Sequence, residues 1–337
     1  MMRRTLVTLA FLGLVLAGLT WILFATHEEP PVDPAWAVEG DRDVPPGAVT
    51  VRWTGTSTLV VSDGVTTLLI DGWFTRIDPL TLYFGSIEPD VAAIEAGLER
   101  NEVTRAAMVL PVHSHFDHAM DAPEVARRTG ALLVGSESTA NIGRGWGLPE
   151  SRIKVVGDGD RLRFGDFEIV VHESRHFEFP DPEIRQRALG DPEIVEPLVP
   201  PVETFAYRVG VPLAVEIAHP RGTLLVQGSA GYVPEALSDV DVDVVLLGVG
   251  GLGSQTPEYR EAYWRETVET TSPTRVIPIH WDDLTAPIDG PFRGSVRIAS
   301  MLGGGDGETL SFLKEKERSS PDIQFLTLPR YDPVILY

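Results

Sequence analysis

Three of the chain's eight histidines lie within six residues, in the stretch His113-Ser-His-Phe-Asp-His118. His113 and His115 are two residues apart, so on an extended backbone their imidazoles point to the same side and can bind one cation. Asp117 and His118 follow where the chain must turn, and a carboxylate beside an imidazole suits a second cation. The stretch therefore predicts two adjacent metal sites, whereas the alternative is a solvated histidine-rich loop.

A second strand ending supplies another candidate ligand. Residues 275–280, Arg-Val-Ile-Pro-Ile-His, repeat the form of residues 109–113, in which an apolar strand is followed by Pro, an apolar residue and His. His280 is therefore predicted to be the remaining imidazole of the second metal site. Asp282 and Asp283 follow it closely, and their carboxylates are expected to lie next to the metal ligands and orient them.

The pattern His-x-His-x-Asp-His at the end of an apolar strand resembles the signature of the metallo-β-lactamase superfamily. The resemblance extends from about residue 48 to about residue 335. It implies an α/β fold, an αββα sandwich with a metal site at one edge. It does not identify a substrate, because one scaffold carries many reactions.

The resemblance also implies a third histidine for the first metal, in a loop after a strand. His176 in Ser174-Arg-His matches that position, and His172, at the end of a predicted strand, is the alternative. His219 lies at a predicted hairpin tip and is a weaker candidate. Relatives place a metal-bridging Asp in a Gly-Asp-Thr-Gly-like turn, whereas this chain has Gly-Ser229-Ala-Gly. Two dications about 4 Å apart repel strongly, so a neutral hydroxyl there should weaken the second site most.

Around these residues the pattern predicts two sets of strands with helices between them. Apolar runs predict buried strands over residues 106–112 and 244–248, and a strand is also expected over residues 204–209. Residues 71–85 are aromatic and rich in turn residues, which suits a pocket wall or a packed loop. Residues 177–202 contain Pro and acidic residues with little periodicity, and this long loop is well placed to cover the metals.

The N-terminal residues 1–27 contain an apolar run from Leu6 to Ala25, preceded by two arginines and followed by two glutamates. Such a run can span a bilayer with its N-terminus in the cytoplasm. We therefore expect a transmembrane anchor and a periplasmic or extracellular catalytic domain. The alternative is a cleaved signal peptide, which would make the protein secreted. Residues 28–47 are predicted to be a linker without a core, and residues 48–337 the hydrolase domain.

The composition narrows the function further. The formal net charge of −21 disfavours nucleic acid as a partner. Because the chain has no cysteine, zinc would need nitrogen and oxygen ligands. One or two Zn²⁺ ions are expected, with Mn²⁺ or Fe²⁺ as alternatives.

The expected function is a metal-dependent hydrolase that uses metal-bound hydroxide on an ester-like bond in a phosphoester or lactone. His113, His115 and His176 would hold the first ion, and Asp117, with His118 and His280, would orient the water or bind the second. The layout looks similar to the branch with ascorbate-6-phosphate lactonase and N-acylphosphatidylethanolamine-hydrolysing phospholipase D, so the substrate would be a small or lipid-like molecule. The alternative is a metal- or ligand-binding protein that has lost turnover.

Overall fold

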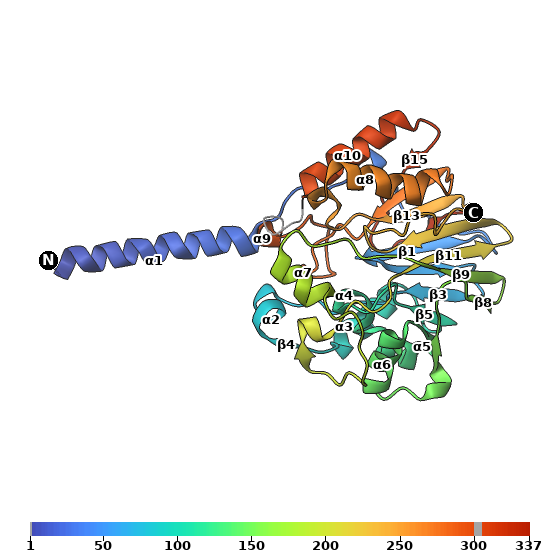
Figure 1. Cartoon of the computed structure of the whole chain (residues 1–337), viewed down its shortest axis with the longest axis horizontal. Helices are drawn as coiled ribbons and strands as arrows, with labels where there is room; N and C mark the ends of the chain where they lie inside the picture. Colours follow the sequence, from blue (N-terminus) through green and yellow to red (C-terminus); the bar gives the residue numbers. More distant parts are fainter. Residues whose placement is uncertain (1, 300–304) are drawn as a thin grey trace.

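The computed structural model describes residues 2–299 and 305–337. Two seven-stranded sheets pack face to face, and helices cover the outer face of each (Figure 1). The first sheet has, in spatial order, β16 (Val334–Ile335), β1 (Thr50–Gly55), β2 (Thr58–Ser62), β3 (Thr67–Ile70), β5 (Met108–Leu110), β6 (Leu132–Gly135) and β7 (Ile153–Val155). The second has β15 (Gln324–Phe325), β14 (Arg275–Ile279), β13 (Val244–Gly248), β12 (Gly222–Gln227), β11 (Leu213–His219), β9 (Phe167–Glu173) and β8 (Arg161–Phe164).

The helices and the short elements complete this sandwich. The α-helices are α1 (Met2–Ala25), α2 (Pro79–Phe84), α3 (Val91–Arg100), α4 (Phe116–Ala119), α5 (Ala122–Thr129), α6 (Glu137–Gly145), α7 (Pro182–Leu189), α8 (Pro257–Trp264), α9 (Arg297–Ala299) and α10 (Asp306–Ser319). A two-stranded sheet pairs β4 (Ser86–Ile87) with β10 (Val202–Glu203). Single turns of 3₁₀ helix are η1 (Pro34–Trp36), η2 (Glu150–Arg152), η3 (Thr204–Ala206) and η4 (Leu252–Ser254), and a π turn, η5 (Arg265–Glu269), extends α8.

The side chains of the central strands point alternately to the two faces of each sheet, which explains why both faces are covered. In β3, Leu68 and Ile70 lie in the core between the sheets, whereas Leu69 faces the helices α3 and α5. Successive side chains of a strand point to opposite faces, so an apolar run such as residues 67–70 is buried on both sides. On the other outer face, α8 and α10 pack their aromatic residues against the second sheet. The mixed αββα architecture agrees with the expected fold class.

The topology brings several strand ends to one edge of the sandwich. β3 and β5 are parallel neighbours in the first sheet, and β12, β13 and β14 are parallel neighbours in the second. Because parallel strands end at the same side of a sheet, the loops that follow them meet there. His113 follows β5, Ser229 follows β12 and His280 follows β14.

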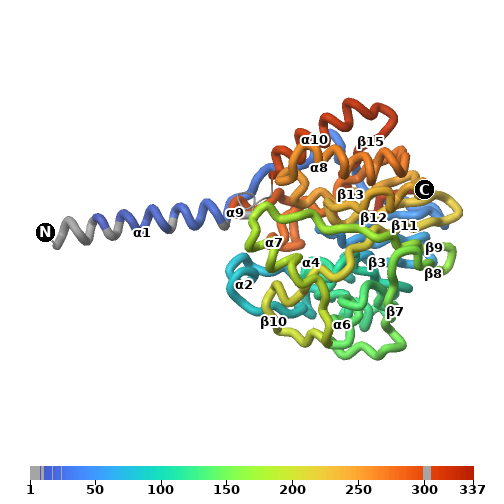
Figure 2. Tube along the Cα trace, viewed as in Figure 1, coloured from blue at the N-terminus to red at the C-terminus, as the bar shows by residue number. Residues whose placement is uncertain are grey.

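The N-terminal helix α1 extends away from the sandwich, as both ribbon and trace show (Figures 1 and 2). In the described part of the chain, no helix is both long enough and apolar enough to cross a membrane. The expected transmembrane helix is therefore without structural support.

The segment 28–47 differs from the predicted linker. Val32 and Trp36 are buried in the main hydrophobic core, with 8% and 4% of their surface exposed, and the Trp36 ring lies 5.0 Å from the ring of Phe325 in β15. The carbonyl of Trp36 accepts a hydrogen bond from the Thr327 amide at 2.7 Å. The segment has few apolar residues and was therefore predicted to be a linker, but Val32 and Trp36 are buried in this core. The segment is therefore part of the domain.

Three other segments have a secondary structure that differs from the prediction or is described only in part. Residues 204–209, predicted as a strand, contain the 3₁₀ turn η3 instead. The predicted loop 177–202 contains α7, which begins where the Asp181 carboxylate caps two backbone amides and Pro182 occupies the first helical position. The sequence also predicts a helix over residues 296–302; α9 covers Arg297–Ala299, and the rest lies outside the described residues.

Candidate metal centre

The first cluster consists of three imidazoles from two loops. His113 and His115 follow β5, and His176 follows β9. The Nε2 atom of His113 lies 3.1 Å from Nδ1 of His115, and the His176 ring lies 5.1 and 4.8 Å from their ring centroids. One nitrogen of each ring lies within 4.8 Å of the others. The structure thus groups His176, and not His172, with the first two histidines.

Neighbouring carbonyl oxygens orient two of these rings. Nε2 of His115 lies 3.2 Å from the carbonyl oxygen of Ala188 in α7, and Nδ1 of His176 lies 2.7 Å from the carbonyl oxygen of Phe177. We assign N–H groups to these two nitrogens, because a carbonyl only accepts. The opposite nitrogens, Nδ1 of His115 and Nε2 of His176, are then free to bind a cation.

Burial keeps the first cluster neutral. Desolvation lowers the pKa of His115 to about 4 and the pKa values of His113 and His176 well below the usual value for histidine. Neutral imidazole is the form that binds a metal, so these side chains need not lose a proton at neutral pH.

The second cluster contains Asp117, His118 and His280. Nε2 of His118 lies 3.0 Å from Nε2 of His280, and these two nitrogens lie 3.5 and 3.4 Å from Oδ2 of Asp117. Burial would raise the pKa of Asp117, but His118 and His280 outweigh it and hold that pKa well below its usual range. The carboxylate is therefore ionised at neutral pH.

Asp71, at the end of β3, fixes the orientation of His118. Its Oδ2 accepts a 2.7 Å hydrogen bond from Nδ1 of His118, and its Oδ1 accepts one from the Val112 amide at 2.9 Å. Burial would lower the pKa of His118, but the carboxylates of Asp71 and Asp117 outweigh this effect and raise it. With its proton on Nδ1, His118 presents Nε2 to the cluster. This role of Asp71 was not predicted from the sequence, although its place at a strand end, before Gly72, was a signal.

Backbone strain gathers around the second cluster. Asp71, His280 and Thr56 have positive φ angles of 58°, 58° and 48°. These values lie in the left-handed region, which is uncommon for residues other than glycine and unusual for a β-branched residue. His280 and Thr56 are also joined, since the His280 amide donates to the Thr56 carbonyl at 2.9 Å. Such strain is typical of functional sites.

The donor geometry fits small divalent cations. With metal–nitrogen bonds of about 2.0–2.1 Å, neighbouring ligands of a tetrahedral ion lie about 3.3–3.4 Å apart. The contacts of 3.0–3.5 Å between donor atoms in the two clusters bracket this value. The clusters also adjoin, because the rings of His113 and His118 have centroids 3.8 Å apart. Each cluster offers three protein ligands, which leaves a coordination position for water or substrate.

The turn at Ser229 lies beside the first cluster. A Cβ on Gly231 would lie 2.0 Å from the carbonyl oxygen of Arg175, the residue before His176. The Ser229 hydroxyl is buried and has no hydrogen-bond partner among the described residues. The backbone carbonyl of Ser229 accepts hydrogen bonds from the Gln227 side chain at 3.1 Å and from the Tyr263 hydroxyl at 3.3 Å.

The other predicted acidic residues have different partners. Oδ1 of Asp282 accepts a 2.5 Å hydrogen bond from the Thr56 amide, which links it indirectly to His280. Asp283 instead contacts Nε2 of His27 at 2.7 Å and accepts a hydrogen bond from Thr285. The expectation that Asp283 lies next to the metal ligands is therefore wrong. Asp283 follows His280 closely, but the chain turns away from the clusters.

The remaining histidines also lie outside both clusters. Nε2 of His172 lies 2.9 Å from Glu216 on the neighbouring strand β11. His219 lies with Asp63 and Asp166 in a separate group at the hairpin ends, where its Nδ1 accepts from the Arg221 amide. That contact places the proton on Nε2, the atom nearest Asp63, which disfavours a metal there.

The segment after His176 covers the first cluster. The rings of Phe177 and Phe179 lie 4.5 and 5.4 Å from the His176 ring, and α7 presents its Ala188 carbonyl to His115. This arrangement reduces the access of solvent to the histidines.

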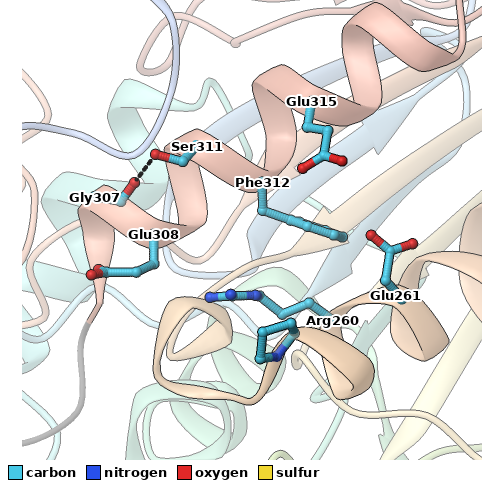
Figure 3. A pocket seen from close by; sticks show the side chains of 8 residues that line it. Arg260, Glu261, Gly307, Glu308, Ser311, Phe312 and Glu315 are labelled. Carbon is cyan, nitrogen blue, oxygen red and sulfur yellow. Dashed lines mark hydrogen bonds between the residues drawn. The ribbon is translucent and has the colours of Figure 1, made fainter.

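A hollow of about 260 Å³ lies between α8 and α10 (Figure 3). Arg260 and Glu261 line it from α8, and Glu308 and Phe312 line it from α10. Its lining contains none of the candidate ligands, so it is separate from the metal centre.

Comparisons with known proteins identify similar metal-dependent hydrolases. No family model matches the chain. A UPF0173 metal-dependent hydrolase of Pyrobaculum islandicum is 26% identical over 238 residues, which cover 69% of this chain and 84% of the relative. A UPF0173 metal-dependent hydrolase of Pyrobaculum calidifontis is 27% identical over 236 residues, with the same coverage of 69% and 84%.

A similar solved structure is Igni18, a metallo hydrolase from the archaeon Ignicoccus hospitalis. It has a TM-score of 0.52 and 16% sequence identity, and the match covers 86% of this chain and 99% of that one. This likeness concerns the fold.

Proposed function

We propose that this chain, which is similar to UPF0173 metal-dependent hydrolases, is a metal-dependent hydrolase of the metallo-β-lactamase superfamily and uses a dinuclear zinc centre to cleave an ester-like bond. The observation that carries the proposal is the convergence of six side chains into two adjoining groups of three. His113, His115 and His176 would hold one ion. Asp117, His118 and His280 would hold the other.

The residues of the chain have separable tasks in this proposal. Bound dications act as Lewis acids toward a carbonyl or phosphoryl oxygen and make water more acidic. Asp117, ionised at neutral pH, would hold a cation and could also accept a hydrogen bond from a water molecule at the site. Asp71 holds the proton of His118 on Nδ1, and the Ala188 carbonyl does the same at Nε2 of His115.

Zinc is the ion that we propose, because imidazole and carboxylate donors at these spacings suit tetrahedral coordination. Mn²⁺ and Fe²⁺ accept the same donors and are the alternatives. Ser229 stands where a bridging carboxylate was expected, so the second ion should bind more weakly than the first. That observation also favours a second candidate function, a metal- or ligand-binding protein without turnover.

For the substrate we propose a phosphoester or a lactone in a small or lipid-like molecule. The similarity of the Pro278-Ile-His-Trp281 ending to the branch with ascorbate-6-phosphate lactonase and N-acylphosphatidylethanolamine-hydrolysing phospholipase D motivates this choice. The net charge of −21 supports the exclusion of nucleic acids, since polyanions would be repelled.

We also propose that α1 attaches the protein to a membrane, with the domain on the periplasmic or extracellular side. Leu14, Leu16 and Trp21 of α1 expose 74%, 67% and 65% of their surface, which favours an apolar partner. The full chain should then sediment with membranes, whereas a chain that begins at Thr26 should not. If both stay in the supernatant, the attachment is refuted. An intact mass that lacks the N-terminal residues would indicate a secreted form.

Turnover is tested with the full-length protein and a panel of phosphodiesters, lactones and thioesters. Hydrolysis of at least one substrate should disappear on chelation, return with Zn²⁺ and be absent from His115→Ala. A protein that binds two ions and hydrolyses nothing in the panel would support the alternative without turnover. Hydrolysis that survives both chelation and His115→Ala would contradict the metal-dependent mechanism.

A further inference from the structure

Arg76, in the loop after β3, is a buried cation without hydrogen bonds. Its side chain exposes only 7% of its surface. All three guanidinium nitrogens are buried and have no hydrogen-bond partner among the described residues. A guanidinium removed from water normally forms charge-assisted hydrogen bonds, which it makes most readily with a carboxylate or phosphate through its planar fork.

The nearest carboxylate does not satisfy Arg76. Oδ2 of Asp282 lies 3.7 Å from Nη2 of Arg76, beyond hydrogen-bond distance, and it lies 4.0 Å from Nη2 of Arg330. Two guanidinium groups therefore share one carboxylate, whose other oxygen accepts from the Thr56 amide. This group of three side chains carries one excess positive charge.

Other nearby charges do not remove the excess. The carboxylate of Asp121 accepts three hydrogen bonds from Phe74 and Thr75, and Asp117 belongs to the second metal cluster. Burial lowers the pKa of Arg76, and the negative charges of Asp282, Asp121 and Asp117 oppose that effect. A guanidinium stays protonated in proteins, so the site is cationic.

The guanidinium lies beside the second metal cluster. Asp282 follows His280 by two residues, and Thr56 joins them by donating its amide to Asp282 and accepting from the His280 amide. The Arg76 guanidinium also stacks 4.0 Å above the ring of Trp73, which packs edge-on against Phe116, between His115 and Asp117 in the sequence.

Gly55 brings its backbone close to this cation. With its φ of +138°, a Cβ there would lie 2.7 Å from Nη2 of Arg76 and 2.4 Å from Oδ2 of Asp282. Any other residue would collide with both groups and would strain the backbone, so this position requires glycine.

We propose that Arg76 binds an anionic group of the substrate, a carboxylate or a phosphate, while the scissile bond lies at the metal centre. The proposal rests on the proposed hydrolase function and adds that the substrate is an anion. The competing interpretation is that Arg76 only neutralises Asp282 and holds the loop after His280.

The two interpretations predict opposite effects for two substitutions. If Arg76 binds an anion, Arg76→Gln removes the fork and weakens binding, whereas Asp282→Asn removes a competing negative charge and strengthens it. If Arg76 only neutralises Asp282, the two substitutions disrupt the same pair and act in the same direction.

The test is a calorimetric titration of the full-length protein, as purified with its metals, with inorganic phosphate and separately with acetate. We expect Arg76→Gln to weaken binding of the preferred anion about tenfold or more, and Asp282→Asn to tighten it. If Arg76→Gln weakens the binding of phosphate more than that of acetate, the anionic group of the substrate is a phosphate; the reverse result indicates a carboxylate. Arg260→Gln, at the hollow between α8 and α10, is the matched control and should bind like the wild type.

Unchanged binding of both anions in Arg76→Gln, or equal weakening in Asp282→Asn, would overturn the proposal. If Arg76→Gln fails to fold, Arg76→Lys decides, because it keeps the charge and loses the fork; binding like the wild type would then refute bidentate recognition. Anion binding needs no turnover, so its loss in Arg76→Gln is measurable even if no hydrolysis is found. Conversely, hydrolysis of neutral esters with no anion site would refute this inference alone.

Discussion

Replacement of Asp71 by Asn should weaken the second metal site selectively. The carboxylate accepts from the Val112 amide at 2.9 Å and from His118 Nδ1 at 2.7 Å, using one oxygen for each. Asn has the same shape and tolerates the φ of 58°, but it has one acceptor and one donor group. If its oxygen keeps Val112, its NH₂ faces Nδ1 and forces the His118 proton onto Nε2, which blocks coordination.

If the Asn oxygen instead faces His118, the Val112 amide loses its acceptor. The second alternative leaves the buried Val112 amide without a partner, which costs about 1–3 kcal/mol, whereas the first places the His118 proton on the nitrogen that should bind the metal. This agrees with the tenfold to hundredfold loss of metal affinity that is typical when a residue that orients a metal ligand is replaced, about 1.4–2.7 kcal/mol. The second site of Asp71→Asn should therefore bind zinc about 10- to 100-fold more weakly.

The assay is a competition titration of the chelator-treated protein with Zn²⁺ and a chromophoric chelator, which resolves two binding steps. Asp63→Asn is the matched control, since Asp63 is also buried and lies 3.7 Å from a histidine, His219, outside the clusters. An unchanged second step in Asp71→Asn, or an equal loss in Asp63→Asn, would refute the assigned role.

His115→Ala should remove the first metal and the activity together, whereas His172→Ala, whose ring contacts Glu216, should do neither; the reverse result would exchange their assignments. Ser229→Asp should tighten the second ion in a metal titration, and no difference from the wild type would mean that its hydroxyl is remote from the metals. Burial raises the pKa of Asp121 to about 6 from 3.8, so between pH 4 and 6 the folded state binds a proton that the unfolded state has lost. The free energy of unfolding should therefore fall by about 1.4 kcal/mol per pH unit across pH 4–6 and level off above pH 6. When the urea midpoint is measured as a function of pH, Asp121→Asn should lack this fall in stability between pH 4 and 6. If the variant and the wild type show the same pH dependence, the raised pKa of Asp121 is contradicted. Trp36→Ala should cost about 3–5 kcal/mol in urea unfolding, and a loss below about 1 kcal/mol would show that the segment is a free tether.

The candidate ligands were accessible from the sequence because each follows a local pattern. The spacing of His113, His115 and Asp117 depends on neighbouring residues only, and His280 repeats the strand ending at His113. The superfamily resemblance added His176. The structure groups these residues, although their loops are far apart in the chain.

The supporting residues could not be predicted in this way. Asp71 contacts His118 across 47 positions, and the Ala188 carbonyl contacts His115 across 73. Such pairs depend on which strand ends meet at the edge of the sandwich, and neither partner belongs to a local pattern. Trp36 was missed for a similar reason, since one aromatic residue in a Pro-rich acidic segment gives no periodic signal but finds a place against the core.

The metal content of the purified full-length protein tests the central claim most directly. After dialysis against excess Zn²⁺ and removal of free metal, elemental analysis should find two ions per chain in the wild type, and fewer in His115→Ala. Less than one ion per wild-type chain, after incubation with Zn²⁺, Mn²⁺ or Fe²⁺, would contradict the assignment of both clusters as metal sites.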